Sequence, residues 1–172
     1  MLKKSFELKL RALSQEDCIA INKAFQTQGW NKPVSQYETY LELHEAGKRD
    51  IIIAEIDHEF AGYLTIQWQS DYPPFKEKAI PEVVDFNVLK KFQRRGIGSA
   101  LMDEAEQRIA LVSAYAGIGV GMTQDYGAAQ VLYVQRNYVP DGRGLVCNHQ
   151  PVTHGDEVTI DDSLVLYLIK KL

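Results

Sequence analysis

The chain has 172 residues, of which 45% are hydrophobic and 24% charged, and its formal net charge is -4. This length and composition favour a single domain with one continuous core over residues 1–172. The negative net charge argues against a nucleic-acid partner bound through a basic face, and it allows a cationic amine substrate. No signal-peptide core and no apolar run long enough to span a membrane occur, so we expect a soluble cytoplasmic protein without a membrane partner.

The first third of the chain predicts one strand and two helices. Apolar and polar residues alternate over residues 6–11, which is the pattern of a half-buried strand. Three acidic or polar residues follow Ser14, so we expect a helix with Ser14 as its N-cap. Gly29 and Pro33 interrupt this helical pattern, and a second helix is expected over residues 34–46.

The middle of the chain predicts a hairpin and then a central strand. Residues 50–56 and 60–69 have the composition of two strands joined by a short polar turn. Residues 70–78 contain two adjacent prolines and several charges, so we expect a loop there. The apolar segment 83–88 is the strand that follows this loop.

A glycine turn follows this strand and leads into a long amphipathic helix. Gly96 and Gly98 remove side chains where the backbone approaches another group, and the helix supplies unpaired N–H groups and the positive end of its dipole. Such a turn predicts an anion site, most simply for a pyrophosphate; a tight turn without a ligand is the alternative. A dinucleotide fingerprint needs a third glycine where this chain has Leu101, which disfavours that class.

The last third predicts a short glycine-rich strand at residues 117–122, a helix over 126–136, and two final strands joined by a long polar connection. The last of these strands, over residues 164–169, is nearly all apolar and therefore central. The two cysteines, Cys18 and Cys147, have neither the spacing of a metal site nor the number of a disulfide framework, and we expect no metal.

Two motifs resemble the GNAT superfamily of acyl-CoA-dependent N-acetyltransferases. The first, Gln/Arg-x-x-Gly-x-Gly/Ala at the start of a helix after an apolar strand, is met at Gln93, Gly96 and Gly98. The second, Ala-x-x-Leu-Tyr with another aromatic residue close behind, is met from Ala129 to Tyr133. The resemblance covers nearly the whole chain. It implies an α/β (α+β) fold with a mixed central sheet of about seven strands, splayed between the fourth and fifth strands and flanked by about four helices.

The resemblance also implies acetyl-CoA as a cosubstrate. Free backbone groups at the end of the strand before the turn would hold pantetheine, at Phe86, Asn87 and Val88. The family often has an asparagine where this chain has Tyr126. The remaining expected contacts lie in the turn, where the pyrophosphate would bind, and on a later helix: Gln93, Arg94, Arg95, Gly96, Ile97, Gly98, Ser99 and Ala129.

Amide formation from a thioester needs an unprotonated amine, a stabilised oxyanion and a proton for the leaving thiolate. The tyrosine of the second motif commonly faces the sulfur, so Tyr133 is the candidate acid, with a core tyrosine as the alternative. Glu82 lies six residues before Val88, the spacing of the catalytic glutamate in histone-acetylating relatives, and Asp85 is the competing base. On an ideal strand these two carboxylates point to opposite faces, so they reach one amine only if a bulge intervenes; a solvated carboxylate is the alternative role for either.

In the resembling family, the loop after the first helix, the second helix and the hairpin end lie beside the acceptor. Trp30, Tyr37, Tyr40 and Trp68 are therefore expected to line that site, and aromatic residues covering the sheet are the alternative. The expected function is transfer of an acetyl group from acetyl-CoA directly to a primary amine of a small molecule or protein. A CoA-binding sensor or interaction module without turnover is the other hypothesis, and both a monomer and a homodimer stay open.

Overall fold

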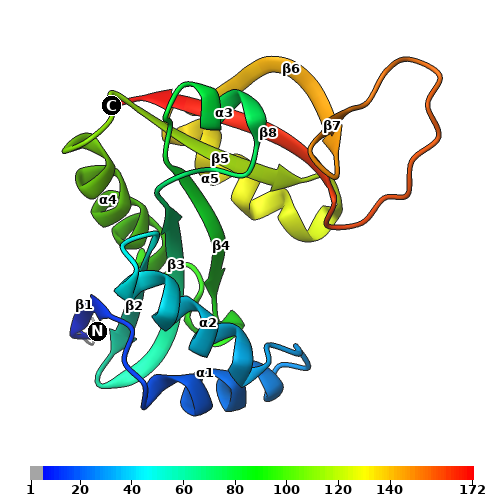
Figure 1. Ribbon diagram of the computed structural model, residues 1–172. Coiled ribbons are helices and arrows are strands. Elements are labelled where there is room, and N and C mark those ends of the chain that lie inside the picture. The colour runs from blue at the N-terminus through cyan, green and yellow to red at the C-terminus, as the bar shows by residue number, and fades with distance from the viewer. Residues whose placement is uncertain (1–5) are drawn as a thin grey trace. The chain divides into compact units, whose positions relative to one another are not determined.

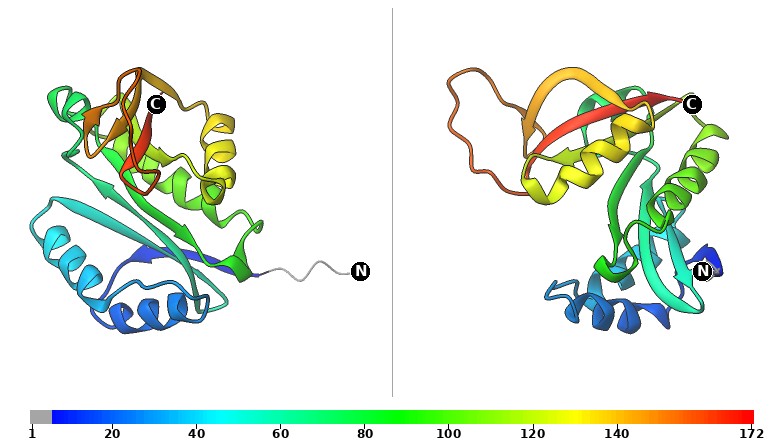
Figure 2. Two further views of the ribbon diagram at one scale, coloured as in Figure 1. Left: turned by 90° about the vertical axis from the view of Figure 1, so that its right-hand side faces the viewer. Right: turned by 180° about the vertical axis from the view of Figure 1, so that it is seen from behind.

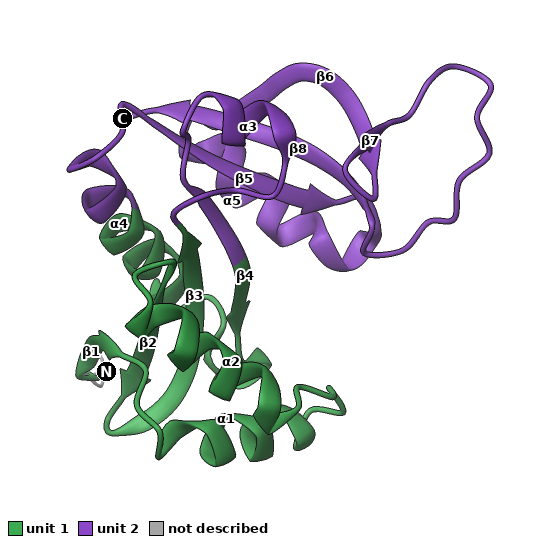
Figure 3. Ribbon diagram, in the orientation of Figure 1, with its two compact units in different colours: residues 1–67, 85–105 green, residues 68–84, 106–172 purple. Residues whose placement is uncertain are grey.

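The computed structural model describes residues 6–172, which form two compact units (Figure 3). Among the described residues, unit 1 comprises residues 6–67 and 85–105, and unit 2 comprises residues 68–84 and 106–172. The strand that links the two halves of the sheet, β4 (Glu82–Val88), contributes its first three residues to unit 2 and the rest to unit 1.

Unit 1 begins with an antiparallel sheet covered by two helices. Strand β2 pairs with β1 on one side and with β3 on the other, and Ile51, Ile52, Ile53 and Ala54 in the middle of β2 are buried. Figures 1 and 2 show the first two helices side by side along one face of these strands. The elements are β1 (Leu8–Ala12), α1 (Asp17–Gln26), α2 (Val34–Glu45), β2 (Arg49–Ile56) and β3 (Glu59–Gln67).

The end of β4 approaches β3 very closely. A Cβ atom on Gly62 would lie 2.5 Å from the carbonyl oxygen of Asn87 and 3.0 Å from Cα of Val88, so only glycine fits at this crossing. The Leu89 N–H then donates to the Ala61 carbonyl at 2.9 Å. After this point the chain forms the 3-10 helix η1 (Lys90–Phe92) and enters α4 (Ile97–Ala110), whose first residues belong to unit 1.

Unit 2 is built on antiparallel strands with one parallel pairing. Strand β5 pairs in parallel with the start of β4 and antiparallel with β8, which in turn pairs with β6. Tyr72 and Tyr167 stack at 3.6 Å between ring centroids, and Phe75 packs edge-on against both rings. The elements are α3 (Pro73–Glu77), β5 (Tyr115–Gly121), η2 (Gln124–Tyr126), α5 (Gly127–Gln135), β6 (Val139–Cys147), β7 (Gln150–Pro151) and β8 (Leu164–Lys171).

Glu106 ties α4 to two other elements of unit 2. Its carboxylate accepts hydrogen bonds from Arg136, just after α5, and from Lys170 in β8, at 2.9 and 2.6 Å. The side chains of Glu106, Arg136 and Lys170 are only 12 to 18% exposed. The two cations therefore compensate the negative charge of Glu106, which is largely removed from water.

The strand order in the sheet is β1-β2-β3-β4-β5-β8-β6-β7, which confirms the expected mixed α/β sheet. Register between β4 and β5 is described only for Glu82 with Gly117 and Val83 with Ile118, so the two strands diverge as the splay predicts. The described sheet has eight strands where about seven were expected, because the short strand β7 adds one. The single-domain boundary of residues 1–172 stays a prediction, and residues 1–5 lie outside the described part.

Two local expectations were wrong. Residues 73–77 form helix α3 instead of a loop, because proline fits the first helical position and the Phe75 side chain gains a buried site. Ser14 is not the N-cap of α1, which begins at Asp17 after Glu16. Instead the Ser14 N–H and hydroxyl both donate to the Asp17 carboxylate, at 2.8 and 2.7 Å, so the Ser14 hydroxyl is a donor here and not the acceptor that an N-cap would be.

In the described residues no helix has the length and apolar character of a membrane span.

The crossing of β3 and β4 generates a stability prediction. Gly62→Ala should destabilise the fold by about 1–3 kcal/mol, because the new Cβ meets backbone atoms that cannot rotate away. Gly127→Ala is the control, since its Cβ would meet nothing within 4 Å and its φ of -56° suits any residue; it should be neutral or stabilising by about 0.4–1 kcal/mol. Urea unfolding of both variants checks this, and equal stability of the two would contradict the close approach.

Candidate functional site

The turn between η1 and α4 has the backbone conformation of an anion site. Arg94 and Gly96 both adopt left-handed conformations, with φ of 59° and 81°, and a Cβ on Gly96 would meet nothing within 4 Å. The Ala100 N–H donates to the Gly96 carbonyl at 3.0 Å, which is the first bond of the helical ladder. The N–H groups of the residues between them have no acceptor within the helix, so the turn and the first turn of α4 present donors together.

Positive side chains surround this turn. Arg94 and Arg95 are exposed, and within the described residues neither forms an ion pair. The Arg95 guanidinium lies 5.4 Å from the centroid of the Phe92 ring, which orders it beside the turn. Lys91, in contrast, is paired with Glu59. The two arginines can therefore add charge-assisted hydrogen bonds to an anion bound by the backbone.

The turn is also tied to the end of β4. The side-chain amide of Gln93 donates to the Val88 carbonyl at 3.3 Å, so the first residue of the motif holds the strand end in place. Phe86, Asn87 and Val88 all lie beyond the part of β4 that is in register with β5. Ile97 is buried as the first residue of α4, whereas Ser99 is exposed in its first turn.

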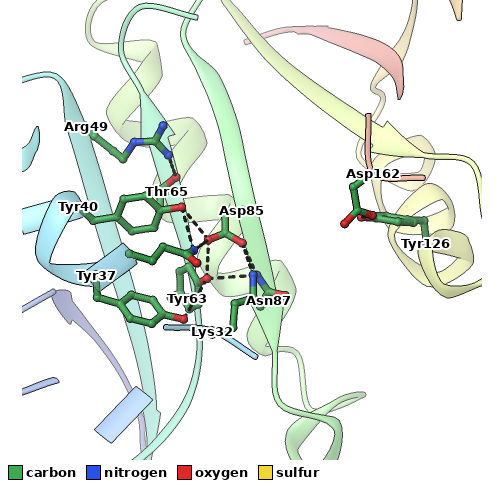
Figure 4. Close-up of polar contacts among 11 residues, drawn as sticks. Lys32, Tyr37, Tyr40, Arg49, Tyr63, Thr65, Asp85, Asn87, Tyr126 and Asp162 are labelled. Atoms are coloured by element: carbon green, nitrogen blue, oxygen red, sulfur yellow. Dashed lines mark hydrogen bonds and ion pairs between the residues drawn. The ribbon is translucent and has the colours of Figure 1, made fainter. Parts of the chain in front are cut away.

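Unit 1 holds a second polar cluster, centred on the Asp85 carboxylate (Figure 4). One oxygen, Oδ1, accepts from the Lys32 ammonium at 2.8 Å and from the Asn87 amide at 2.7 Å. The other oxygen, Oδ2, accepts from the Gln36 amide at 2.7 Å and from two phenols. Those phenols belong to Tyr40, at 2.9 Å, and to Tyr63, at 2.5 Å. We call these six residues the Asp85 cluster: Lys32, Gln36, Tyr40, Tyr63, Asp85 and Asn87.

The backbone at Asp85 is irregular. Its φ is 52°, a left-handed conformation that interrupts the extended backbone of β4 and that aspartate tolerates better than most residues. Such a conformation persists when surrounding contacts over-determine it, and here five donors hold the side chain. The expectation of an ideal strand, in which Glu82 and Asp85 point to opposite faces, therefore does not apply to β4.

The Asp85 carboxylate is held in its ionised form. Burial opposes ionisation, but the charge and hydrogen bond of Lys32, together with the bonds from Tyr63 and Tyr40, hold the pKa of Asp85 below its ordinary value. Burial next to this carboxylate raises the pKa of the Tyr40 and Tyr63 phenols far above their usual range. At neutral pH the cluster therefore consists of one carboxylate, one ammonium and neutral hydrogen-bond donors.

Of the expected acceptor residues, Tyr40 belongs to the Asp85 cluster, and the other three occupy different environments. Tyr37 is fully buried, and its phenol donates to the Tyr63 hydroxyl at 3.4 Å, behind the Asp85 cluster. Trp30 is 36% exposed and stacks on Phe25 with 5.8 Å between ring centroids. Trp68 belongs to unit 2, directly after β3, and is half-buried. Tyr37 therefore contacts a member of the cluster.

Sequence reasoning expected Tyr40 beside the acceptor and Asn87 beside the cofactor, but it missed the other three donors to Asp85, which are Lys32, Gln36 and Tyr63. Gln36 and Tyr40 are four residues apart on α2, and their side chains meet at 3.1 Å, so helical spacing could have paired them. Arg49 was also missed: its guanidinium lies 4.9 Å from the Tyr40 ring centroid and donates to Thr65 and Gln67 at 2.8 and 2.9 Å. Its Nε is buried without a partner among the described residues, and no sequence pattern marked it.

Unit 2 contains the remaining expected residues. Tyr133, on α5, is 5% exposed, and burial raises the pKa of its phenol well above the usual range. Ala129 lies one turn earlier on the same helix and is half-buried. Tyr126 donates to the Asp162 carboxylate at 2.8 Å (Figure 4). Glu82 is 8% exposed, and its carboxylate accepts a short hydrogen bond from the Ser70 hydroxyl.

A family model matches most of the chain. The model of the acetyltransferase (GNAT) family matches residues 15–138. No curated protein matches the sequence significantly.

Solved structures share the fold at low sequence identity. An N-acetyltransferase from Staphylococcus aureus Mu50 has a TM-score of 0.71 at 15% identity, over 96% of this chain and 98% of its own. The acetyltransferase YncA from Salmonella typhimurium, solved with acetyl-CoA, has a TM-score of 0.68 at 13% identity, over 95% and 93%. An acetyltransferase from the same organism that modifies the N-terminal serine of ribosomal protein L7/L12 has a TM-score of 0.69 at 14% identity, over 96% and 95%. Because the family model covers most of the chain and the fold agrees, the protein belongs to the acetyltransferase (GNAT) family.

Proposed function

We propose that this protein is an N-acetyltransferase that transfers an acetyl group from acetyl-CoA directly to a primary amine of a small molecule or protein. The observation that carries the proposal is the turn before α4, where left-handed residues, free helix N–H groups and two unpaired arginines converge on one anion site. Solved structures of the same fold support the choice of donor, since YncA was solved with acetyl-CoA and RimL, a ribosomal L7/L12 α-N-protein acetyltransferase, with coenzyme A.

The residues of the turn fit a pyrophosphate. The backbone N–H groups of Gly96, Gly98 and Ser99 would bind its oxygens, with Arg94 and Arg95 adding charge. The end of β4, which diverges from β5 and is fixed by Gln93, would hold pantetheine through the backbone of Phe86, Asn87 and Val88. Ala129 would line the same cofactor from α5. When bound, acetyl-CoA supplies the thioester that is transferred.

The lowered pKa of Asp85 distinguishes it from Glu82, the other candidate base. A base must take a proton from the amine, and a carboxylate whose pKa is lowered does so poorly. Asp85 therefore serves in this proposal as a fixed negative charge that acts on the acceptor electrostatically. Glu82, buried three residues earlier on β4 with the Ser70 hydroxyl as a donor, is the proposed base.

Tyr133 is the proposed acid for the leaving thiolate. Burial keeps its phenol protonated at neutral pH, which a proton donor requires. The raised pKa also makes the phenol a weaker acid, which lowers the driving force for proton transfer to the thiolate. The expected rate enhancement is therefore at the low end for a general acid. Trp30, Tyr37 and Trp68 stay proposed contributors to the acceptor side, where Tyr37 acts through its contact with Tyr63.

A binding module without turnover is the second candidate. It is favoured by the ionised state of Asp85 and by Tyr126, whose phenol is bound to Asp162 where the family often has an asparagine. The two functions differ in one measurement, the release of CoA thiol from acetyl-CoA in the presence of a panel of polyamines, aminoglycosides, amino acids and peptides. Release with an acceptor supports the enzyme. Tight CoA binding without release for any amine would replace it with the module.

The pyrophosphate assignment predicts that Gly98→Glu abolishes CoA binding, because a side chain and a negative charge enter the anion site. Gln107→Glu adds the same charge on the exposed face of α4, far from its N-terminus, and should leave affinity unchanged. Calorimetric titration of CoA into both folded variants measures this. Equal affinity of Gly98→Glu and the wild type would remove the turn from the site.

The acid role predicts the effect of Tyr133→Phe, which keeps the ring and its packing but removes the proton. Turnover should fall about 100-fold, at the low end of general acid catalysis, while CoA affinity and melting temperature stay near wild type. Tyr115→Phe is the control, since Tyr115 is 42% exposed at the start of β5. A rate within about threefold of wild type, with chemistry shown to limit turnover, would assign Tyr133 to packing alone.

A further inference from the structure

The Asp85 cluster contains a negative charge that takes no part in proton transfer in the proposed reaction. A carboxylate kept ionised by five donors is a poor base, but it is a strong and preorganised partner for a cation. The cation that occupies it in this structure is a primary ammonium from the chain itself, that of Lys32. The other four donors are neutral, so the cluster is electrically balanced only while an ammonium is present.

Lys32 is placed as a removable occupant. It lies in the connection between α1 and α2, and its backbone carbonyl is held by the Asn22 amide at 2.7 Å. Its side chain, 21% exposed, has one described polar contact, the bond to Asp85. Rotation about the side-chain bonds can therefore withdraw the ammonium into water without disturbing the backbone anchor, and a long lysine side chain has the rotamer freedom for this.

We propose that Lys32 stands in for an ammonium group of the acceptor, and that Asp85, Gln36, Tyr40, Tyr63 and Asn87 form a subsite for one primary alkylammonium. In the free protein Lys32 fills the subsite; an acceptor displaces it and restores the charge balance. The assignment of this ligand as the acceptor rests on the proposed function, whereas the affinity of the subsite for an alkylammonium does not.

The electrostatics of the subsite also define the class of acceptor. An ammonium bound to an ionised carboxylate has its pKa raised and stays protonated, so it lacks the lone pair that attacks a thioester. The attacking amine must then be a different group of the same molecule. Arg49, stacked on the other side of the cluster against the Tyr40 ring, adds a positive charge that opposes a second ammonium nearby. The structure thus points to a dibasic acceptor, with one ammonium anchored at Asp85 and one amine free to react.

Chemical rescue tests the subsite without acetyl-CoA. Lys32→Ala removes the three carbons and the nitrogen of n-propylammonium, so that ion should refill the space and raise the melting temperature of the variant. The expected rise is about 3 °C at a tenfold excess over the dissociation constant. Neutral 1-propanol and sodium chloride at equal ionic strength should give no rise. Lys23→Ala, an exposed lysine on α1 without a described side-chain contact, should not respond to n-propylammonium.

A second variant covers the case in which Lys32→Ala does not fold. Lys32→Met keeps a stem of the same number of atoms, with sulfur in place of Cδ, and lacks the terminal nitrogen, so the ammonium ion itself should stabilise it where sodium ion does not. Selective stabilisation of either folded variant supports the subsite. The absence of a selective shift in every variant that folds, or an equal shift in Lys23→Ala, overturns it.

The acceptor class is tested by comparing butane-1,4-diamine with n-butylamine in the CoA-release assay. The diamine should have a kcat/KM at least about tenfold higher, as expected for a hydrogen bond to a charged group, and Asp85→Asn should reduce this ratio to the statistical factor for two equivalent amines. If the wild-type kcat/KM for the diamine exceeds that for n-butylamine by no more than this statistical factor, the assignment of a dibasic acceptor is overturned. Failure of all CoA release, with rescue intact, would reject the proposed function and leave the ammonium subsite standing.

Discussion

The Asp85 carboxylate is the interaction on which the first unit depends. Its five donors come from the connection before α2, from α2 itself, from β3 and from β4, so one charged group fixes four segments at a single point. Because the folded-state pKa of Asp85 lies below its unfolded value, this contribution to stability is complete above the ordinary carboxyl pKa. It is lost as the pH falls through the folded-state pKa. The same contacts hold the left-handed backbone of Asp85 in place.

The donor and acceptor sides of the proposed site are built from different parts of the chain, backbone in one and side chains in the other. The donor side, as proposed, is made mainly by backbone, because two left-handed residues and a helix terminus present N–H groups. The acceptor side, as proposed, is made by side chains gathered around one carboxylate. Solved acetyltransferase structures share the fold with this chain at only 12 to 15% sequence identity, so the fold does not define the acceptor.

The same difference between a backbone turn and a side-chain cluster explains which parts of the site the sequence could predict. The turn at residues 93–99 is contiguous, so its residue types and its place before a helix were readable directly, as was the splayed mixed sheet. The partners of Asp85 were not readable, because Lys32, Gln36 and Tyr40 lie 45 to 53 residues away in the chain and only the fold brings them together. The apolar pattern of β4 also gave no sign of the left-handed backbone at Asp85. Helix α3 was missed because two prolines indicate a loop unless a buried aromatic such as Phe75 anchors a helical turn.

The central claim, that Asp85 is a fixed negative charge paired with an ammonium, is tested most directly by the pKa of its side chain. Carbon-13 NMR of aspartate carboxyls can follow this titration, with Asp85→Asn identifying the resonance. The account predicts a pKa below the ordinary value of about 3.9 in the wild type, and an upward shift in Lys32→Ala that n-propylammonium reverses. A wild-type pKa at or above the ordinary value, or one that removal of Lys32 leaves unchanged, would contradict it.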